Sequence, residues 1–349
     1  MVRVGVIGCG KIAQVRHIPE YLDNKDSELV GLYDMNQERA NNLADKYHCK
    51  AYKSVEDILN EKEIDAVSIC VANNAHASIT LQALNAGKHV LCEKPMATTI
   101  EDCEAMVNTA KEKRKILMIG QNQRFAKAHV EAKKLLRQGE IGDVITFKTT
   151  FGHGGPETWS VDSGPATWFF DKKRAAMGVM ADLGIHKTDL IQYLLDDVVV
   201  ETTSKIVTLD KKDSSGNLIG VDDNAICIYR MKKGAIGTMT ASWTYYGEED
   251  NSTILYGTKG IMKIYDDPSY CIEVIRKDGG KIFYNIDQIQ TNDKQTKSGI
   301  IDAFVEAIKT NKEPPVSGES VLNAMRAVFG SMKSSESGIS VKVNEEVVL

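Results

Sequence analysis

A glycine-rich turn directly after an apolar run is the feature that most constrains the fold of this chain. Residues 2–7 are typical of a buried strand, and residues 8–13 follow with the letters GCGKIA, which fit G-x-G-x-x-G/A. Gly8 permits a tight turn, Gly10 lets the backbone approach a pyrophosphate, and the small Ala13 lets a helix pack closely on the strand. A helix that begins here directs unpaired N–H groups toward phosphates. The residues predicted to bind a dinucleotide at this turn are Gly8, Cys9, Gly10, Lys11 and Ile12.

An acidic residue, Asp34, strengthens this weak single motif because it ends the next apolar run about 20 residues further on. Its carboxylate can accept hydrogen bonds from the ribose hydroxyls and would repel a 2′-phosphate, so NAD is favoured over NADP. Met35 beside it supplies no cation, whereas Arg39 lies one helical turn onward and could reach a phosphate. All three residues are assigned to the cofactor site. The alternative interpretation is a glycine-rich turn with a surface aspartate.

Later strand ends carry further cofactor candidates, because the carboxyl ends of strands near the switch point line the cofactor crevice. Asn73 and Asn74 follow the predicted strand 66–71 and could reach ribose or nicotinamide. His76 begins the next helix, where capping or packing is a simpler role than catalysis. The other residues assigned to the cofactor site are Ala72, Glu93, Lys94 and Asn122.

The first part of the chain alternates short apolar runs with amphipathic ones, which predicts βαβ units in a doubly wound parallel sheet. The predicted strands are 2–7, 29–33, 66–71, 89–92 and 116–119, and the predicted helices are 37–47, 54–60, 77–86 and 100–114. We predict an NAD-binding Rossmann domain over residues 1–122. A substrate-binding and oligomerisation domain is expected over residues 123–349, with a last helix that can return toward the first domain.

The second part of the chain is rich in Thr, Val, Ile and Tyr and predicts an α+β domain with an open-faced, mainly antiparallel mixed sheet. The predicted strands are 144–151, 198–208, 224–231, 235–245, 253–256, 260–264, 271–276 and 281–285, and the helices are 128–138, 181–195, 300–309 and 319–334. Helices on one face leave the other face open, and apolar residues there need covering. We therefore expect a homodimer or homotetramer; the alternative is a polar outer face on a monomer.

Composition excludes several classes of partner. The chain has 43 Lys and Arg against 48 Asp and Glu, a formal net charge of -5, and no concentrated basic run, so nucleic acid is not an expected partner. Its seven cysteines are scattered without a Cys-x-x-Cys pair, which suits a reducing cytoplasm and argues against zinc or disulfides. We find no signal peptide and no apolar run that could span a bilayer, so we expect a cytoplasmic protein without a membrane partner.

Two ionisable groups of residues could carry chemistry. Lys94 lies in Glu93-Lys94-Pro95 at the end of strand 89–92, where a lysine can polarise a carbonyl or pass a proton. Asp182 and His186 are at i, i+4 on a predicted helix, an arrangement that can orient a base for proton transfer. The simpler alternatives are a Lys94–Glu93 ion pair and a structural histidine. A metal at Asp182 and His186 would lack a third soft ligand, so no metal is expected.

The blocks 8–13, 86–95 and 178–189 together resemble the glucose-fructose oxidoreductase / inositol dehydrogenase / rhizopine-catabolism (Gfo/Idh/MocA) oxidoreductase family. The similarity extends to residues 121–125, 256–260 and 314–318. The resemblance implies an N-terminal Rossmann domain, a C-terminal open-faced sheet used in subunit contacts, and a cis peptide bond before Pro95.

The resemblance also implies that Lys94, Asp182 and His186 are catalytic residues of an NAD-dependent dehydrogenase acting on a sugar, a cyclitol such as inositol, or a related polyol. His186 would remove the hydroxyl proton, Asp182 would assist it or bind a neighbouring hydroxyl, and Lys94 would polarise the reacting oxygen. The alternatives within this fold are a glycosidase that uses NAD transiently and a non-catalytic NAD-binding regulator.

Substrate recognition is expected in part from the long loop 153–174, where aromatic faces can stack on a sugar ring. The loop could equally be a lid that packs on itself or a subunit contact. The candidate substrate residues are Arg124, His153, Trp168 and Tyr246.

Overall fold

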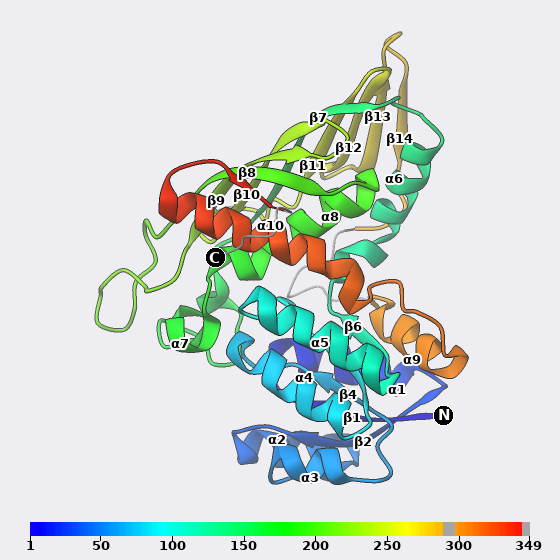
Figure 1. Cartoon of the computed structure of the whole chain (residues 1–349), viewed down its shortest axis with the longest axis vertical. Helices are drawn as coiled ribbons and strands as arrows, with labels where there is room; N and C mark the ends of the chain where they lie inside the picture. The colour runs from blue at the N-terminus through cyan, green and yellow to red at the C-terminus, as the bar shows by residue number, and fades with distance from the viewer. Residues whose placement is uncertain (289–296, 344–349) are drawn as a thin grey trace. The chain divides into compact units, whose positions relative to one another are not determined.

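The structure is a computed structural model that describes residues 1–288 and 297–343 (Figure 1). It divides into two compact units, each built around one sheet. The first comprises Met1–Asn122, Trp159–Asp162 and the described part of Thr291–Leu322, and the second comprises Gln123–Thr158 and the described parts of Ser163–Gln290 and Asn323–Leu349. The domain division at residues 122 and 123 stays a prediction.

The first unit contains a six-stranded parallel sheet, sheet A, in the order β3-β2-β1-β4-β5-β6. Its strands are β1 Val2–Ile7, β2 Ser27–Tyr33, β3 Lys50–Ala51, β4 Ala66–Ile69, β5 His89–Cys92 and β6 Leu117–Ile119. This order confirms the predicted doubly wound Rossmann fold. The sequence analysis missed β3, because a two-residue edge strand is too short to show a periodic pattern.

Helices cover both faces of sheet A, so its central strands are buried apolar runs. The helices are α1 Ile18–Asp23, α2 Gln37–Tyr47, α3 Val55–Asn60, α4 His76–Asn85, α5 Ile100–Lys113 and α9 Ile300–Thr310. Asn36 and Thr99 cap α2 and α5 by accepting backbone N–H bonds. Helices α4 and α5 lie side by side (Figure 1), and α9 packs against α1 and β1.

The second unit contains a nine-stranded sheet, sheet B, in the order β14-β13-β12-β11-β7-β10-β9-β8-β15. Its strands are β7 Val144–Gly152, β8 Val199–Val207, β9 Asn224–Met231, β10 Ile236–Ser242, β11 Thr253–Gly257, β12 Gly260–Asp267, β13 Tyr270–Arg276, β14 Lys281–Tyr284 and β15 Val341–Lys342. The β7–β10 pair is parallel and the other pairs are antiparallel. The predicted mixed, mainly antiparallel sheet is confirmed.

Helices α6 Lys127–Arg137 and α8 Ile185–Leu195 and most of α10 Gly318–Ser337, from Asn323 onward, belong to the second unit. Helices α6 and α8 contact each other, and α8 also contacts β7. Helix α10 runs along β8, where Ser331 Oγ lies 2.9 Å from Thr202 Oγ1. One face of sheet B is therefore covered by helices.

Several element boundaries differ from the predicted ones. The predicted helix 181–195 begins as a π-helical turn, Met180–Gly184, and becomes α-helical only at Ile185. The predicted strand 235–245 is shorter, because β10 ends at Ser242. The loop 153–174 contains short helical turns, among them α7 Lys172–Ala175.

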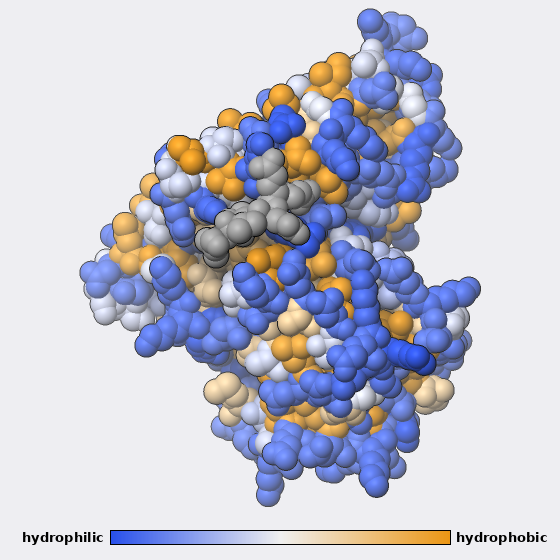
Figure 2. Space-filling view, in the orientation of Figure 1, coloured by the Kyte–Doolittle hydropathy of each residue, from blue (hydrophilic) through white to orange (hydrophobic). Residues whose placement is uncertain are grey.

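The other face of sheet B carries exposed apolar side chains. In β9, Ala225, Cys227, Tyr229 and Met231 are buried and the residues between them are exposed. Ile226 and Ile228 of β9 and Ile236 of β10 are 56%, 50% and 48% exposed. Figure 2 shows hydrophobic residues over the strands of sheet B. We refer to Ile226, Ile228 and Ile236 as the open-face isoleucines.

None of the helices in the described ranges combines the length and apolar character needed to cross a membrane.

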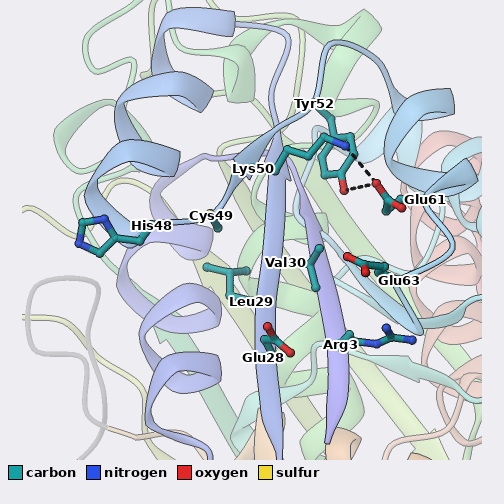
Figure 3. A pocket seen from close by; sticks show the side chains of 10 residues that line it. All are labelled: Arg3, Glu28, Leu29, Val30, His48, Cys49, Lys50, Tyr52, Glu61 and Glu63. Carbon is teal, nitrogen blue, oxygen red and sulfur yellow. Dashed lines mark hydrogen bonds and ion pairs between the residues drawn. The ribbon is translucent and has the colours of Figure 1, made fainter.

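A shallow pocket lies beside the short edge strand β3 of the first unit (Figure 3). Glu61 accepts hydrogen bonds there from Lys50 Nζ at 3.0 Å and from the Tyr52 hydroxyl at 3.1 Å. Arg3 and Glu28, also in its wall, lie near the starts of β1 and β2. The glycine-rich turn instead follows the end of β1, so this pocket is separate from the predicted cofactor site.

Candidate active site

The glycine-rich turn leaves the end of β1 in a conformation that requires glycine. Gly8 has φ +93°, and a Cβ atom there would lie 2.4 Å from the carbonyl oxygen of Cys70. A Cβ at Gly10 would meet nothing within 4 Å, so open space remains on the side where a pyrophosphate would approach. Lys11 and Ile12 are half-buried at the start of the following helix. The turn therefore fits the phosphates of a dinucleotide.

Asp34 is held beside this turn by two backbone donors. Its Oδ2 accepts from the N–H of Cys9 at 2.7 Å, and its Oδ1 accepts from the N–H of Asn36 at 2.8 Å. Arg39 Nη1 lies 3.7 Å from Asp34 Oδ1, whereas Met35 is 89% exposed. The carboxylate is fixed where ribose hydroxyls would complete its hydrogen bonds, so these residues suit the adenosine end of a dinucleotide.

The loop after β4 presents the next group of predicted cofactor residues. Asn73 is buried and Asn74 is exposed in a short 3₁₀ turn that Ala72 precedes. His76 is 1% exposed, with Nδ1 2.7 Å from the carbonyl oxygen of Pro95 and Nε2 3.1 Å from that of Val71. His76 thus joins the loops after β4 and β5, and its role toward a cofactor stays a prediction. Asn122, half-buried after β6, donates its backbone N–H to Gly120 O at 3.0 Å.

A series of buried hydrogen bonds leads to the end of β5, where Lys94 follows Glu93. His17 Nε2 is 2.8 Å from Glu93 Oε1, and His17 Nδ1 is 3.0 Å from Ser68 Oγ. The Tyr21 hydroxyl lies 2.7 Å from the same Oγ. Glu93 Oε2 also accepts from the backbone N–H of Lys94 at 3.2 Å. These hydrogen bonds, from the Tyr21 hydroxyl to the Glu93 carboxylate, fix the end of the strand that Lys94 follows.

Glu93 stays ionised in this setting. Burial by itself would raise its pKa, but the hydrogen bond and charge of His17, together with Arg16 and Lys94, lower the pKa to about 2. Lys94 is half-buried, and the peptide bond between Lys94 and Pro95 is cis, as the resemblance implies.

In the second unit, Asp182 and His186 are buried on consecutive turns of the helical segment. Asp182 is 5% exposed and His186 is 7% exposed. Asp182 Oδ2 accepts from the indole N–H of the fully buried Trp243 at 3.0 Å. Because this donor comes from the end of β10, the carboxylate is anchored to sheet B as well as to its own helix.

Asp222 secures the start of the same helical segment. Its two carboxylate oxygens accept from the backbone N–H groups of Gly178 and Met180, each at 2.8 Å. Burial raises the pKa of Asp222 despite these bonds. The contact ties the π-helical turn that carries Asp182 to the segment just before β9.

Ring contacts link His186 to Phe151 and link the aromatic residues of loop 153–174 to Trp243. The Phe151 ring centroid lies 6.0 Å from that of His186 and 5.9 Å from that of His153. The Gly155 N–H donates to His153 Nδ1 at 3.0 Å, so a neutral His153 ring carries its proton on Nε2. Trp168 stacks on Phe169 at 3.9 Å, and Phe169 meets Trp243 edge-on at 6.4 Å. The aromatic part of loop 153–174 therefore packs on the residue that anchors Asp182.

The remaining substrate candidates have protein partners. Arg124 forms a two-pronged ion pair with Asp189, in which Nε lies 2.7 Å from Oδ2. Tyr246 is 67% exposed, and its hydroxyl donates to Asp210. Partial burial and, to a lesser extent, this hydrogen bond raise the pKa of Tyr246 to about 12. Their roles toward a substrate stay predictions. Over residues 1–288 and 297–343, no three His, Cys, Asp or Glu side chains are grouped to hold a metal ion.

Two models of one protein family match this chain. Residues 2–121 match the model described as "Oxidoreductase family, NAD-binding Rossmann fold", and residues 129–263 match the GFO/IDH/MocA C-terminal domain, in the same order. The chain belongs to the Gfo/Idh/MocA oxidoreductase family. The predicted family, and with it the oxidoreductase class, are confirmed.

Relatives in the Gfo/Idh/MocA family align over nearly the whole chain. The chain is 27% identical over 351 residues to a myo-inositol 2-dehydrogenase of Thermotoga maritima, with 99% of each chain covered. The solved structure of an aldose-aldose oxidoreductase from Caulobacter crescentus, complexed with glycerol, has a TM-score of 0.83 at 26% identity and covers 98% of this chain and 99% of that chain. A levoglucosan dehydrogenase in complex with NADH and levoglucosan shares the fold, with a TM-score of 0.85 at 23% identity, covering 98% of this chain and 99% of that chain.

Sequence reasoning missed three residues that support the candidate site of this Gfo/Idh/MocA protein. His17 contacts Glu93, Trp243 contacts Asp182, and Asp222 holds the turn before His186. Each acts across a large sequence separation, so no local motif joins it to its partner. The only signals were a histidine in the helix after the glycine-rich turn, a tryptophan at a strand end, and paired aspartates before a strand.

Proposed function

We propose that this protein is an NAD-dependent dehydrogenase that oxidises a ring hydroxyl of a sugar, cyclitol or related polyol, or reduces the corresponding ketone. The observation that carries the proposal is the buried Asp182–Trp243 hydrogen bond one helical turn before His186. It orients a buried carboxylate one helical turn from a buried imidazole, an arrangement that can serve proton transfer. The glycine-rich turn and Asp34 would hold the NAD that supplies the redox half of the reaction.

The catalytic residues in this proposal are Lys94, Asp182 and His186. When bound, NAD would supply the acceptor for the hydride of the carbon that carries the hydroxyl. His186 removes the hydroxyl proton, and Asp182, oriented by Trp243, stabilises the imidazolium that results. Lys94 polarises the reacting oxygen, and the Glu93–His17 contact keeps its backbone in place.

The substrate class is supported by residues of loop 153–174, which contact the neighbours of His186 and Asp182, and by the relatives. An Nε2–H of His153 can donate to a hydroxyl, and the rings of Trp168 and Phe169 offer faces on which a sugar ring can stack. Similar proteins named as a myo-inositol 2-dehydrogenase and an aldose-aldose oxidoreductase support a cyclitol or sugar substrate. A direct test is NADH formation with purified protein, NAD and a panel of aldoses, glycosides and cyclitols. Cleavage of a chromogenic glycoside without net NADH would favour the glycosidase, and NAD binding without turnover of any substrate would favour the regulator.

We also propose NAD over NADP, and Asp34→Ala tests this. Without the carboxylate, NAD should bind about tenfold more weakly, because its ribose contacts are lost, and discrimination against NADP should relax. Titration of NADH and NADPH, followed by cofactor fluorescence, measures both effects. Glu63→Gln in the separate pocket is the charge-matched control and should change neither affinity. Unchanged binding in Asp34→Ala would remove Asp34 from the cofactor site.

A homodimer or homotetramer through the open-face isoleucines is part of the proposal, because these apolar side chains are about half exposed on one face of β9 and β10. Ile228→Glu should shift the protein toward a monomer in sedimentation-velocity runs. Val130→Glu, on a residue 48% exposed in α6, is the matched control and should leave the mass unchanged. A monomeric wild type, or an unchanged mass in Ile228→Glu, would contradict this interface.

We propose the reducing cytoplasm as the location of the protein, because its seven unpaired cysteines suit that compartment.

A further inference from the structure

A short piece of the long loop belongs to the cofactor-binding unit. Trp159–Asp162 groups with the first unit, although the loop residues on both sides of it belong to the second. Asp162 Oδ1 lies 2.6 Å from Arg39 Nη2, so the loop reaches the helix that follows Asp34. Asp162, which is 123 residues from Arg39 in the sequence, is therefore a neighbour of the predicted adenosine site.

The Arg39 guanidinium has a carboxylate on each of its two terminal nitrogens. Nη1 lies 3.7 Å from Asp34 Oδ1, and Nη2 contacts Asp162. The side chains of Asp34 and Arg39 are 12% and 19% exposed, whereas that of Asp162 is 62% exposed. Arg39 is also fixed at its backbone, where its N–H donates to Asn36 Oδ1 at 3.0 Å. The cluster of two acids and one base carries a net charge of about −1.

The chemistry of this cluster bears on the choice between the two nicotinamide cofactors. An arginine fork one helical turn beyond the ribose-binding acid is the group best suited to hold a 2′-phosphate. Asp162 occupies that fork and adds a negative charge beside it. A 2′-phosphate would therefore meet a paired guanidinium and two carboxylates, whereas a ribose hydroxyl carries no charge to repel.

We propose that Asp162 is a specificity-determining residue, which keeps Arg39 from binding a 2′-phosphate and so favours NAD(H) over NADP(H). The inference rests on the proposed cofactor site and adds to it a determinant outside the Rossmann sequence motif. The competing interpretation is a surface ion pair without effect on cofactor choice, since exposed pairs contribute little.

The test compares Asp162→Asn with the wild type by titrating NADH and NADPH into the full-length protein and following cofactor fluorescence at low and high salt. The variant should bind NADPH about fivefold more tightly and NADH within about twofold of the wild type. High salt should shrink the gain, because it is electrostatic. Asp162→Glu keeps the negative charge and should therefore keep the wild-type ratio of NADH and NADPH affinities.

Two further variants separate the ion pair from a general charge effect. Glu38→Gln removes one negative charge from an exposed position next to Arg39 in α2 and should leave the ratio unchanged. In an Arg39→Ala background, Asp162→Asn should lose its effect on NADPH. An unchanged ratio in Asp162→Asn, an equal shift in Glu38→Gln, or a persistent shift without Arg39 would each overturn the proposal. If Asp34→Ala still weakens NADH in that case, only the role of Asp162 fails; if it does not, the proposed cofactor site fails with it.

Discussion

Replacing His186 by alanine is expected to lower kcat by roughly 100-fold or more, while the affinity for NADH stays within about twofold of the wild type. The imidazole is buried on α8 one turn after Asp182 and next to Phe151, and in our account it removes the hydroxyl proton. Without it, no group at that position can take the proton near neutral pH. Steady-state kinetics on the best substrate and NADH titration measure the two quantities.

His48→Asn is the matched histidine control for this loss. His48 is exposed in the first unit with φ 54°, a conformation that asparagine tolerates, so the variant should keep wild-type kcat. Normal turnover in His186→Ala would remove His186 from the reaction. An equal fall in NADH affinity would instead point to a structural role.

Replacing His17 by leucine is expected to reduce the free energy of unfolding by about 3–5 kcal/mol. His17 is fully buried, and its Nε2 lies 2.8 Å from the carboxylate of Glu93, which is itself 6% exposed. The substitution leaves that carboxylate in the interior without its closest partner, and Ser68 Oγ loses its contact with Nδ1. Urea unfolding at neutral pH measures the change.

The double variant His17→Leu/Glu93→Leu separates the pair from simple packing loss. Removing both partners eliminates the unpaired charge, so the double variant should be more stable than the sum of the single effects by roughly 2 kcal/mol or more. Additive losses would show that the two residues do not stabilise each other.

The same pair predicts a direction for pH. The folded pKa of Glu93, about 2, lies below its ordinary value of 4.5, so its contribution of about 3 kcal/mol is present at neutral pH and is lost as pH falls from about 5 toward 2. Glu93→Leu should therefore lose less stability than the wild type over that interval.

Much of the fold could be predicted from the sequence because its signals are local. The run 2–7 with the turn 8–13 and the acid Asp34 specify the start of a Rossmann sheet, and alternating residues in 224–231 specify a half-covered strand. The π-helical turn at Met180–Gly184 could not be predicted, since its hydrogen bonds join residues five apart instead of four and the residue pattern is nearly the same.

The candidate site was only partly accessible to sequence reasoning. Lys94, Asp182 and His186 could be selected from residue type, position and family resemblance, and their roles remain predictions. Their supports could not be found in this way, because Trp243 is 61 residues from Asp182 and His17 is 76 residues from Glu93. Such contacts are decided by how strands are ordered in each sheet, which no short motif encodes.

The most direct test of the central claim follows a deuterium label from substrate to cofactor. A cyclitol or sugar that turns over is supplied with deuterium on the carbon that bears the reacting hydroxyl, together with NAD. We expect one deuterated NADH for each ketone formed, detected by mass spectrometry, and transfer slowed by roughly 100-fold or more in His186→Ala. Product formation without label in the cofactor pool, or glycoside cleavage without net NADH, would contradict a dehydrogenase.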